Sequence, residues 1–319
     1  MFTARCIGVS LAVFVVLYVF LSVTVSRGWK LIRSVFRPRS ARGMADLLFA
    51  LRILPLALSS VVTLAITLPS FLLLEPRSTN ESIGAAPLAL GVCCLILLGA
   101  GIARAAMAQL RASRALVEWL DGSILMECQT SESGNAVPVF RTGNNALTLT
   151  VAGVCNPKVL VSEAAVAMLN PLELRTALRH EIAHARRHDN LRKLLFRFSV
   201  FPAMAELEYV WSEETEMAAD DAAVSTFQDA LELAAALIKV ARLGAIQSSG
   251  ELTMALLHSS TALSARVRRL VAWDKVQKPQ FQGRRLYALP AAAVIVVAVI
   301  RTYGSVLTQM HALTEWLVR

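Results

Sequence analysis

Three long stretches without a charged residue constrain the fold of this chain more than any other feature. They are Cys6–Ser26, Ile53–Leu74 and Ser82–Ala103, of 21, 22 and 22 residues. An α-helix needs about 20 apolar residues to cross a bilayer, so each stretch predicts a transmembrane helix. The composition agrees, because 55% of the residues are hydrophobic and only 17% are charged. We therefore expect a mostly α-helical membrane protein with three N-terminal transmembrane helices in residues 1–103.

A fourth uncharged run, Leu286–Ile300, is shorter and ends at Arg301. It can span the membrane if the Arg301 side chain extends to the interface and the next residues complete the helix. This predicts a fourth transmembrane helix at 286–307 and a short external tail at 308–319. Pro290 lies inside the run, and the alternative is a helix that lies on the membrane surface.

Basic residues predict the orientation of the helices. The stretch 27–52 holds seven arginine or lysine residues and one acidic residue, Asp46. Basic loops stay in the cytoplasm. We therefore expect a cytoplasmic loop at 27–52, an external N-terminus and a cytoplasmic domain at 104–285.

The net charge of +9 does not by itself indicate a nucleic-acid partner. Much of this charge flanks the apolar runs, where it sets topology and contacts the anionic lipid of the bilayer. The sequence contains no nucleic-acid-binding motif. None of the five cysteines forms a CxxC pair, so neither a disulfide scaffold nor a cysteine zinc site is expected.

The cytoplasmic part combines short strands with helices. Residues 105–120 continue the third run as a helix. Asn170, Pro171 and Glu173 then make a strong helix start, with an N-cap, a proline in the first turn and a capping box. Later helices are expected at 213–224, 228–243 and 263–273. Short strands, separated by Gly and Asn turns, are expected at Val137–Phe140, Ala146–Ala152 and Lys158–Ser162.

The predicted helix after Asn170 carries the sequence His180-Glu181-Ile182-Ala183-His184. Histidines four residues apart lie on one helix face, about 6 Å apart along the axis, and can bind one Zn²⁺. Glu181 is rotated by about 100°, so it can reach a water on the metal and act as general base. His188 would lie about 12 Å from His180 and is too far to share the metal. We expect His188 and Asp189 to form a solvated or supporting surface.

A third metal ligand is expected from another helix. Glu216 is the best candidate, because Asp220 follows one turn later and can accept a hydrogen bond from a ligand histidine. Ala218 and Ala219 would allow the two helices to approach closely. Glu213 and Glu214 are competitors for the ligand role, but neither is followed by an acid four residues later.

With these motifs the chain resembles the BlaR/MecR-type antirepressor membrane zinc metallopeptidases. The resemblance covers most of the chain through the order of its spans, and its motifs are Gly153–Val161, Leu174–Asp189 and Glu216–Asp220. It implies a gluzincin-like α+β peptidase domain with a small β-sheet, in a bacterial inner membrane. It also implies Zn²⁺ on His180, His184 and Glu216, with Glu181 catalytic. The implied substrate is a cytoplasmic or membrane protein, such as a transcriptional repressor. The family's external β-lactam sensor domain would follow the fourth span, and because the sequence ends at Arg319 we expect no built-in antibiotic sensing.

Two alternatives remain open at the sequence level. HtpX-like and CAAX-processing membrane peptidases share the HExxH and ExxxD motifs. A protein from another class, a non-catalytic membrane signalling protein with a structural metal site, is disfavoured by the presence of Glu181. For transition-state support the candidates are Arg266 and His258, although a surface arginine and a loop histidine are the favoured interpretations of these two positions.

Overall fold

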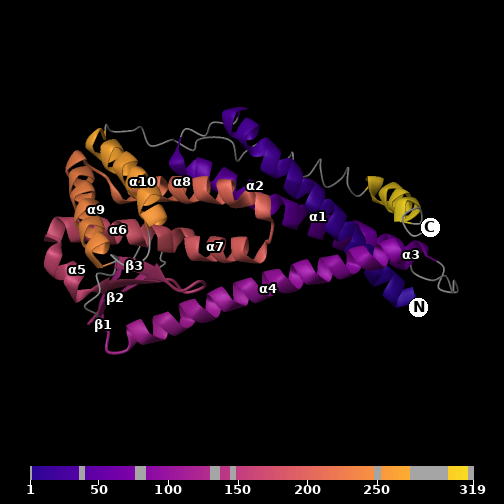
Figure 1. Cartoon of the computed structure of the whole chain (residues 1–319), viewed down its shortest axis with the longest axis horizontal. Coiled ribbons are helices and arrows are strands. Elements are labelled where there is room, and N and C mark those ends of the chain that lie inside the picture. Colours follow the sequence, from indigo (N-terminus) through magenta and orange to yellow (C-terminus); the bar gives the residue numbers. More distant parts are fainter. Residues whose placement is uncertain are drawn as a thin grey trace.

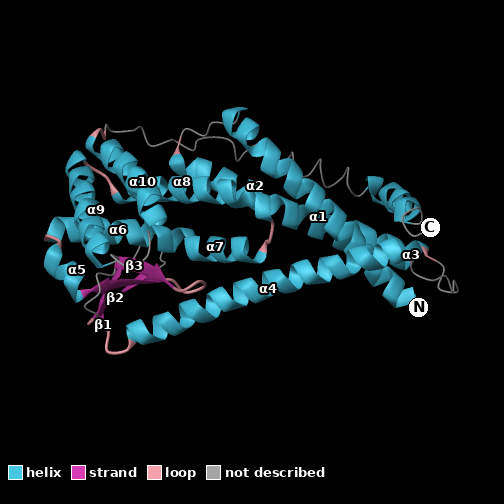
Figure 2. Ribbon diagram, viewed as in Figure 1, coloured by secondary structure: helices cyan, strands magenta, loops and turns pink. Residues whose placement is uncertain are grey.

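The computed structural model describes residues 2–35, 40–75, 84–129, 137–143, 149–247, 253–273 and 301–314. Within these ranges the chain is mostly helical, with one small mixed sheet. The molecule is elongated, with long helices toward one end and a group of shorter helices and the sheet at the other (Figures 1 and 2). The expected mostly helical architecture with a small sheet is therefore present.

Three helical segments contain the first two uncharged runs and the third from residue 85 onward. Each of them is long and apolar enough to cross a membrane. The middle segment begins as α2, passes through the π-helical stretch η1 and ends as α3. The bounds are α1 (Phe2–Val35), α2 (Ala41–Val62), η1 (Thr63–Thr67), α3 (Leu68–Leu74) and α4 (Ala85–Leu120).

Large apolar side chains lie exposed along these segments. Phe20 is 64% exposed, Leu73 71% and Ile96 65%. Soluble proteins rarely leave contiguous apolar surface of this kind uncovered. The exposed side chains are consistent with helices that face lipid.

Residues 27–52, expected as a loop, are mostly helical. The helix α1 continues to Val35 and α2 begins at Ala41. Ser40 then caps α2, because its Oγ accepts a hydrogen bond from the Gly43 N–H at 3.1 Å.

The expected fourth transmembrane helix at 286–307 lies mostly outside the described residues, as does the domain boundary at 285. Residues 301–314 form a helix, so the first part of the expected tail is helical. The Tyr303 hydroxyl donates to the Ala65 carbonyl at 2.6 Å. This helix therefore packs beside the middle apolar segment.

The sheet has four strands in the order β1-β2-β4-β3. The pairs β1–β2 and β3–β4 are antiparallel, and β2–β4 is parallel. The strands expected from the sequence correspond to β2, β3 and β4, of which β2 is longer at its end and residues 146–148 lie outside the described ones. The edge strand β1 was not expected. The bounds are β1 (Ile124–Gln129), β2 (Val137–Thr142), β3 (Leu149–Ala152) and β4 (Lys158–Ser162).

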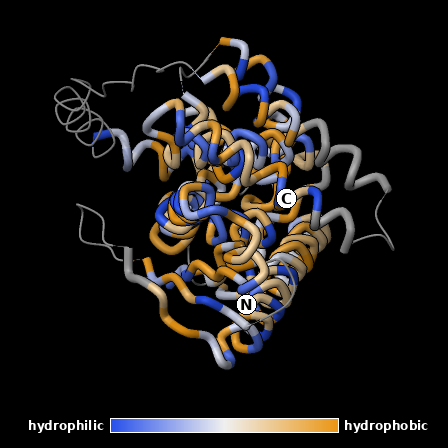
Figure 3. The backbone as a smooth tube through the Cα atoms, turned by 90° about the vertical axis from the view of Figure 1, so that its left-hand side faces the viewer, coloured by the Kyte–Doolittle hydropathy of each residue, from blue (hydrophilic) through white to orange (hydrophobic). Residues whose placement is uncertain are grey.

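Between the sheet and residue 273, the described part of the chain forms the α-helices α5 to α10 and one 3-10 turn. Of the helices expected at 213–224, 228–243 and 263–273, the first and last begin earlier than predicted. Viewed along the long axis, the helices of this end carry both hydrophilic and hydrophobic residues (Figure 3). The bounds are α5 (Glu163–Met168), α6 (Pro171–Arg187), α7 (Asp189–Phe198), the 3-10 turn η2 (Pro202–Met204), α8 (Ala205–Ala223), α9 (Phe227–Gln247) and α10 (Thr253–Val271).

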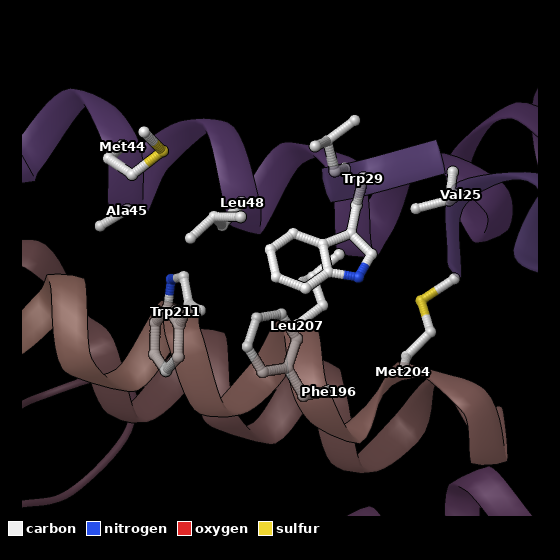
Figure 4. Packing of buried hydrophobic residues seen from close by; sticks show 10 residues of the cluster. Val25, Trp29, Met44, Ala45, Leu48, Phe196, Met204, Leu207 and Trp211 are labelled. Carbon is white, nitrogen blue, oxygen red and sulfur yellow. The ribbon is translucent and has the colours of Figure 1, made fainter. Parts of the chain in front are cut away.

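One apolar cluster joins the long helices to α7 and α8. Its members come from α1, α2, α7, the end of η2 and α8, so side chains far apart in sequence pack together (Figure 4). Phe196 and Trp211 meet edge to face, with ring centroids 4.8 Å apart. This packing fixes α8 relative to α1 and α2. The buried members are Val25, Trp29, Met44, Ala45, Leu48, Leu51, Phe196, Met204, Leu207 and Trp211.

A buried arginine strengthens the same junction. The Arg52 side chain on α2 is only 2% exposed. Its Nε donates to Glu208 at 2.8 Å, its Nη1 donates to the Ser199 hydroxyl at 2.6 Å, and its Nη2 donates to the Ser199 carbonyl. A buried guanidinium is tolerated when its donors are paired in this way. The contact ties α2 to α8 and to the turn that precedes it.

Candidate metal centre

The helix α6 is held at both ends. At its start the Asn170 Oδ1 accepts from the Glu173 N–H at 2.8 Å, and the Glu173 carboxylate accepts from the Asn170 N–H at 2.8 Å. This is the capping box expected from the sequence. At its end His188 adopts the left-handed conformation, with φ of 52°. The chain turns there, and α7 begins at Asp189.

The two faces of α6 have different partners. Ile182 and Ala185 pack on the sheet together with Val139 and Val159. Because a helix turns by about 100° per residue, side chains two positions from Ile182 point away from the sheet. His180 and His184 therefore face away from it, and α6 packs against α8 on another side.

Small residues on α8 allow this close packing. Ala218 is 4% exposed and Ala219 is fully buried, as expected for residues at a close helix contact. Glu216 and Asp220 lie four residues apart on α8 and so point from the same face. They reach the histidines of α6.

The ligand atoms of His180, His184 and Glu216 all lie within 4.8 Å of one another. The two Nε2 atoms are 3.2 Å apart. The Glu216 oxygens lie 3.5 Å from His180 Nε2 and 3.6 Å from His184 Nε2. A tetrahedral zinc ion with bonds of about 2.0–2.2 Å holds its ligand atoms roughly 3.3–3.6 Å apart. The observed spacing and the donor set of two imidazoles and a carboxylate therefore fit zinc.

Each of the two histidines also contacts a carboxylate through its other ring nitrogen. His180 Nδ1 lies 3.0 Å from the Asp220 Oδ1, and His184 Nδ1 lies 2.7 Å from the Asp189 Oδ2. Both acids are almost completely buried. A carboxylate at Nδ1 orients the ring and leaves Nε2 for a metal. The contact of Asp220 was expected from the sequence.

The structure separates His188 from Asp189, which the sequence analysis placed together. We expected it, with His188, in a solvated or supporting surface. His188 is exposed and ends α6, but Asp189 is buried beneath His184. Its position depends on the left-handed backbone of His188, after which Asp189 begins α7 with its carboxylate at His184 Nδ1.

Arg266 is not the surface arginine favoured from the sequence. Its side chain is 13% exposed and donates to Asp220 through Nε at 2.8 Å and Nη2 at 2.6 Å. Its Nη1 also donates to Glu216 at 2.9 Å. This bidentate contact fixes the Asp220 carboxylate opposite His180. Arg266 is more buried than expected because α10 packs against α9 and this side chain reaches across to the acids of α8.

The other candidates lie at different places. His258 falls within α10 rather than in a loop, and its side chain is outside the described part of the structure. Glu214 pairs with Arg33 at 3.4 Å, away from the histidines. Glu213 lines a cleft beside Glu216. Neither competitor joins the group of three ligand atoms in the described residues.

The electrostatics of the site couple these groups. Burial lowers the pKa of His180, but the contacts with Asp220 and Glu216 outweigh it and raise that pKa to about 9. Burial raises the pKa of Glu216, but the contacts with the two histidines and with Arg266 outweigh burial and hold that pKa far below its ordinary range. Burial raises the pKa of Glu181, against the pull of the two histidines.

A cleft of about 460 Å³ opens beside Glu216. It lies between α8, α9 and α10, and its walls include Met217, Leu237 and Leu263 with Arg266 at one side. Pockets of this size that combine apolar walls with a few charged groups are typical of ligand sites. The cleft therefore connects the metal-ligand group with an apolar surface.

No protein-family model matches the chain, and no curated protein matches it. The functional assignment consequently depends on the residues and geometry of the site.

Proposed function

We propose that this protein is an integral membrane zinc-dependent endopeptidase of the gluzincin type. The observation that carries the proposal is the convergence of His180, His184 and Glu216 from two helices, with spacing suited to zinc and a carboxylate at each histidine. Glu181 supports a catalytic rather than a structural site, because a structural site does not need an acid next to its ligand.

In this proposal His180, His184 and Glu216 hold the ion. Zinc, when bound, lowers the pKa of a water molecule and polarises the peptide carbonyl. Glu181 accepts the proton of that water on its carboxylate and then delivers it to the nitrogen of the leaving amine. Burial that raises the pKa of Glu181 suits both steps, because a group that must take and give a proton works best when its pKa lies near the working pH.

The remaining residues prepare the site. Asp220 and Asp189 orient the histidines, and Arg266 holds Asp220 and Glu216 in place. The cleft between α8, α9 and α10 is the proposed place for an apolar side chain of the substrate. We assign the proposed peptidase domain, residues 104–285 (the peptidase half), to the cytoplasmic side of a bacterial inner membrane, because the basic stretch 27–52 favours that orientation.

For the biological role we propose signalling by cleavage of a cytoplasmic or membrane protein, as in the BlaR/MecR-type antirepressors that the motifs resemble. A transcriptional repressor is the proposed substrate class. Cleavage of a winged-helix repressor encoded beside this protein, at one defined bond, would support this role over general membrane quality control.

Peptidase activity tests the proposal. The full chain is purified in detergent, loaded with one equivalent of Zn²⁺ and incubated with casein and a fluorogenic peptide library. Cleavage by the wild type, its loss with Glu181→Gln at unchanged zinc content and its loss with a chelator are expected. Glu163→Gln is the matched control and should retain activity, because Glu163 is exposed on α5 and lines neither the metal-ligand group nor the cleft. Equal cleavage by Glu181→Gln and wild type would overturn the catalytic assignment.

A further inference from the structure

A second pocket lies on another face of the α6–α8 pair. Its volume is about 400 Å³, and α6, α8 and the first turn of α2 form its walls. Ala183 and Ala218, which line it, neighbour the metal ligands in sequence, but His180, His184 and Glu216 do not line it. The pocket is therefore separate from the proposed active site.

Four of the residues that line this pocket are arginines. They are Arg42 from α2 and Arg179, Arg186 and Arg187 from α6, and no carboxylate lines the pocket among the described residues. The guanidinium groups gather on one side of the molecule without an acid between them. Such a concentration of positive charge attracts an anion.

Nearby acids neutralise this charge only in part. Arg179 lies 3.8 Å from Asp229, which also pairs with Arg175 at 3.5 Å. Arg187 lies 3.6 Å from Asp46. Asp46 makes its closer contact with another arginine, Arg192, at 2.8 Å.

Arg42 and Arg186 have no ion pair anywhere in the described ranges. Both are exposed, and they lie at the open side of the pocket.

Arg187 is the most deeply buried of the four arginines. Its side chain is 90% buried, with 10% exposed, yet neither Nη1 nor Nη2 has a hydrogen-bond partner. Only its Nε donates, to Asp189 at 3.4 Å. A buried donor without an acceptor costs free energy, so such groups are normally paired. Both nitrogens are closed off from solvent, and Nη2 lies 3.6 Å from the Asp46 Oδ1, so Arg187 adds its charge to the pocket wall rather than an open donor.

The N-terminus of α2 adds to the positive charge at the pocket. Arg42 lies in its first turn, and no acidic residue occupies that turn. The positive end of a helix of this length attracts anions. The α2 start, the exposed Arg42 and Arg186 and the buried charge of Arg187 thus meet at one pocket.

We propose that this pocket binds a phosphoryl anion. A phosphoryl group carries several acceptor oxygens and up to two charges, which match several forked guanidinium donors better than a single carboxylate does. The volume leaves room for a group attached to the phosphorus. The shared chemistry could come from inorganic phosphate or from an anionic phospholipid headgroup, and α2 continues from this pocket into an apolar segment that could span a membrane.

Calorimetric titration of the detergent-purified full chain with inorganic phosphate tests the proposal. Chloride at matched ionic strength is the control for screening. One saturable site per chain is expected, with binding weakened about 10-fold or more in Arg186→Gln and in Arg42→Gln, because each removes a charged hydrogen bond. Both side chains are exposed, so neither change should unfold the protein. Arg111→Gln, exposed on α4, should bind phosphate as the wild type does.

A second titration identifies the source of the phosphoryl group. Short-chain phosphatidylglycerol and phosphatidylcholine are titrated in the presence of phosphate. Displacement by phosphatidylglycerol alone identifies an anionic headgroup, and binding of phosphate without displacement by either lipid identifies a soluble phosphate. Absence of saturable phosphate binding, or equal binding by wild type, Arg42→Gln and Arg186→Gln, overturns the proposal.

Discussion

At the scale of single residues, each histidine of the site is paired with one buried carboxylate. Each of the two histidines has one nitrogen toward the common centre and the other toward a buried acid. The acids differ in origin, because Asp220 belongs to α8 and Asp189 begins α7. The orientation of the histidines therefore depends on three helices rather than on α6 alone.

Asp220→Asn should weaken zinc affinity about 10–100-fold without unfolding the domain, since the amide orients His180 less well and no longer carries the charge that Arg266 pairs with. Asp221→Asn is the control, because Asp221 pairs with Arg269 at the surface. Competition with a chromophoric chelator measures both affinities. Identical zinc affinity in Asp220→Asn and wild type would show that Asp220 does not support the ligand.

Zinc binding should release protons at neutral pH. The pKa of His180 is raised to about 9 in the metal-free site, so the residue carries a proton at pH 7 and must lose it to bind zinc. By the same shift, the stabilisation of the metal-free fold by His180 is complete below about pH 6.5 and is lost as the pH rises through about 9.

Calorimetry in buffers of different ionisation enthalpy counts these protons. We expect at least one proton per zinc at pH 7, and an affinity that rises about tenfold per pH unit between pH 6 and pH 8. Zinc binding with no proton exchange would contradict the assignment of His180 as a ligand.

The sequence predicted those residues whose relation lies within one helix. The spacing of His180 and His184, and that of Glu216 and Asp220, follows from helix periodicity. Arg266 contacts Asp220 across 46 residues of sequence, by reaching from α10 to α8, and no local pattern specifies this contact. The place of Asp189 depends on a left-handed residue at His188, where no glycine announces the turn.

At the scale of elements, apolar runs and helix caps predicted the helices from the sequence, whereas the strand at the sheet edge was not predicted. The capping box at Asn170 and the apolar runs predicted α6, α1 and α4. The strand β1 was missed because Ile124 and Leu125 are both exposed and lie at a sheet edge with a bulge, so no in–out alternation marks it. The early start of α8 was missed because its first turns pack on α1 and α2.

A close helix contact supplies a test at this scale. A Cβ at Gly101 of α4 would overlap the Phe198 carbonyl at the end of α7, whereas a Cβ at Gly99 would meet nothing within 4 Å. Gly101→Ala should destabilise the protein by about 1–3 kcal/mol through overpacking. Gly99→Ala should be neutral or stabilise it by about 0.5–1 kcal/mol.

Thermal unfolding of the two variants in one detergent makes this comparison. A lower midpoint for Gly101→Ala alone is the expected result. Equal midpoints would show that α4 and α7 do not approach each other as closely as the structure describes.

At the scale of the whole molecule, the orientation in the membrane decides which substrates the site can reach. Two single-cysteine variants report this orientation. The first keeps only the native Cys155, which is exposed. The second carries only Leu313→Cys, at a position where the native leucine is 58% exposed. In intact cells an impermeant thiol reagent should leave Cys155 unlabelled and should label the cysteine at 313. Labelling of Cys155 would place the peptidase half outside the cell, while protection of the second cysteine would remove the fourth span.

The zinc content of the purified chain tests the central claim most directly. Elemental analysis after zinc loading and removal of excess metal should find one zinc per wild-type chain, and the same in Glu213→Ala. His184→Ala and Glu216→Ala should lose it, because each removes one of three atoms that converge from α6 and α8. Stoichiometric zinc in Glu216→Ala together with its loss in Glu213→Ala would contradict the account, as would a wild-type chain that retains no zinc.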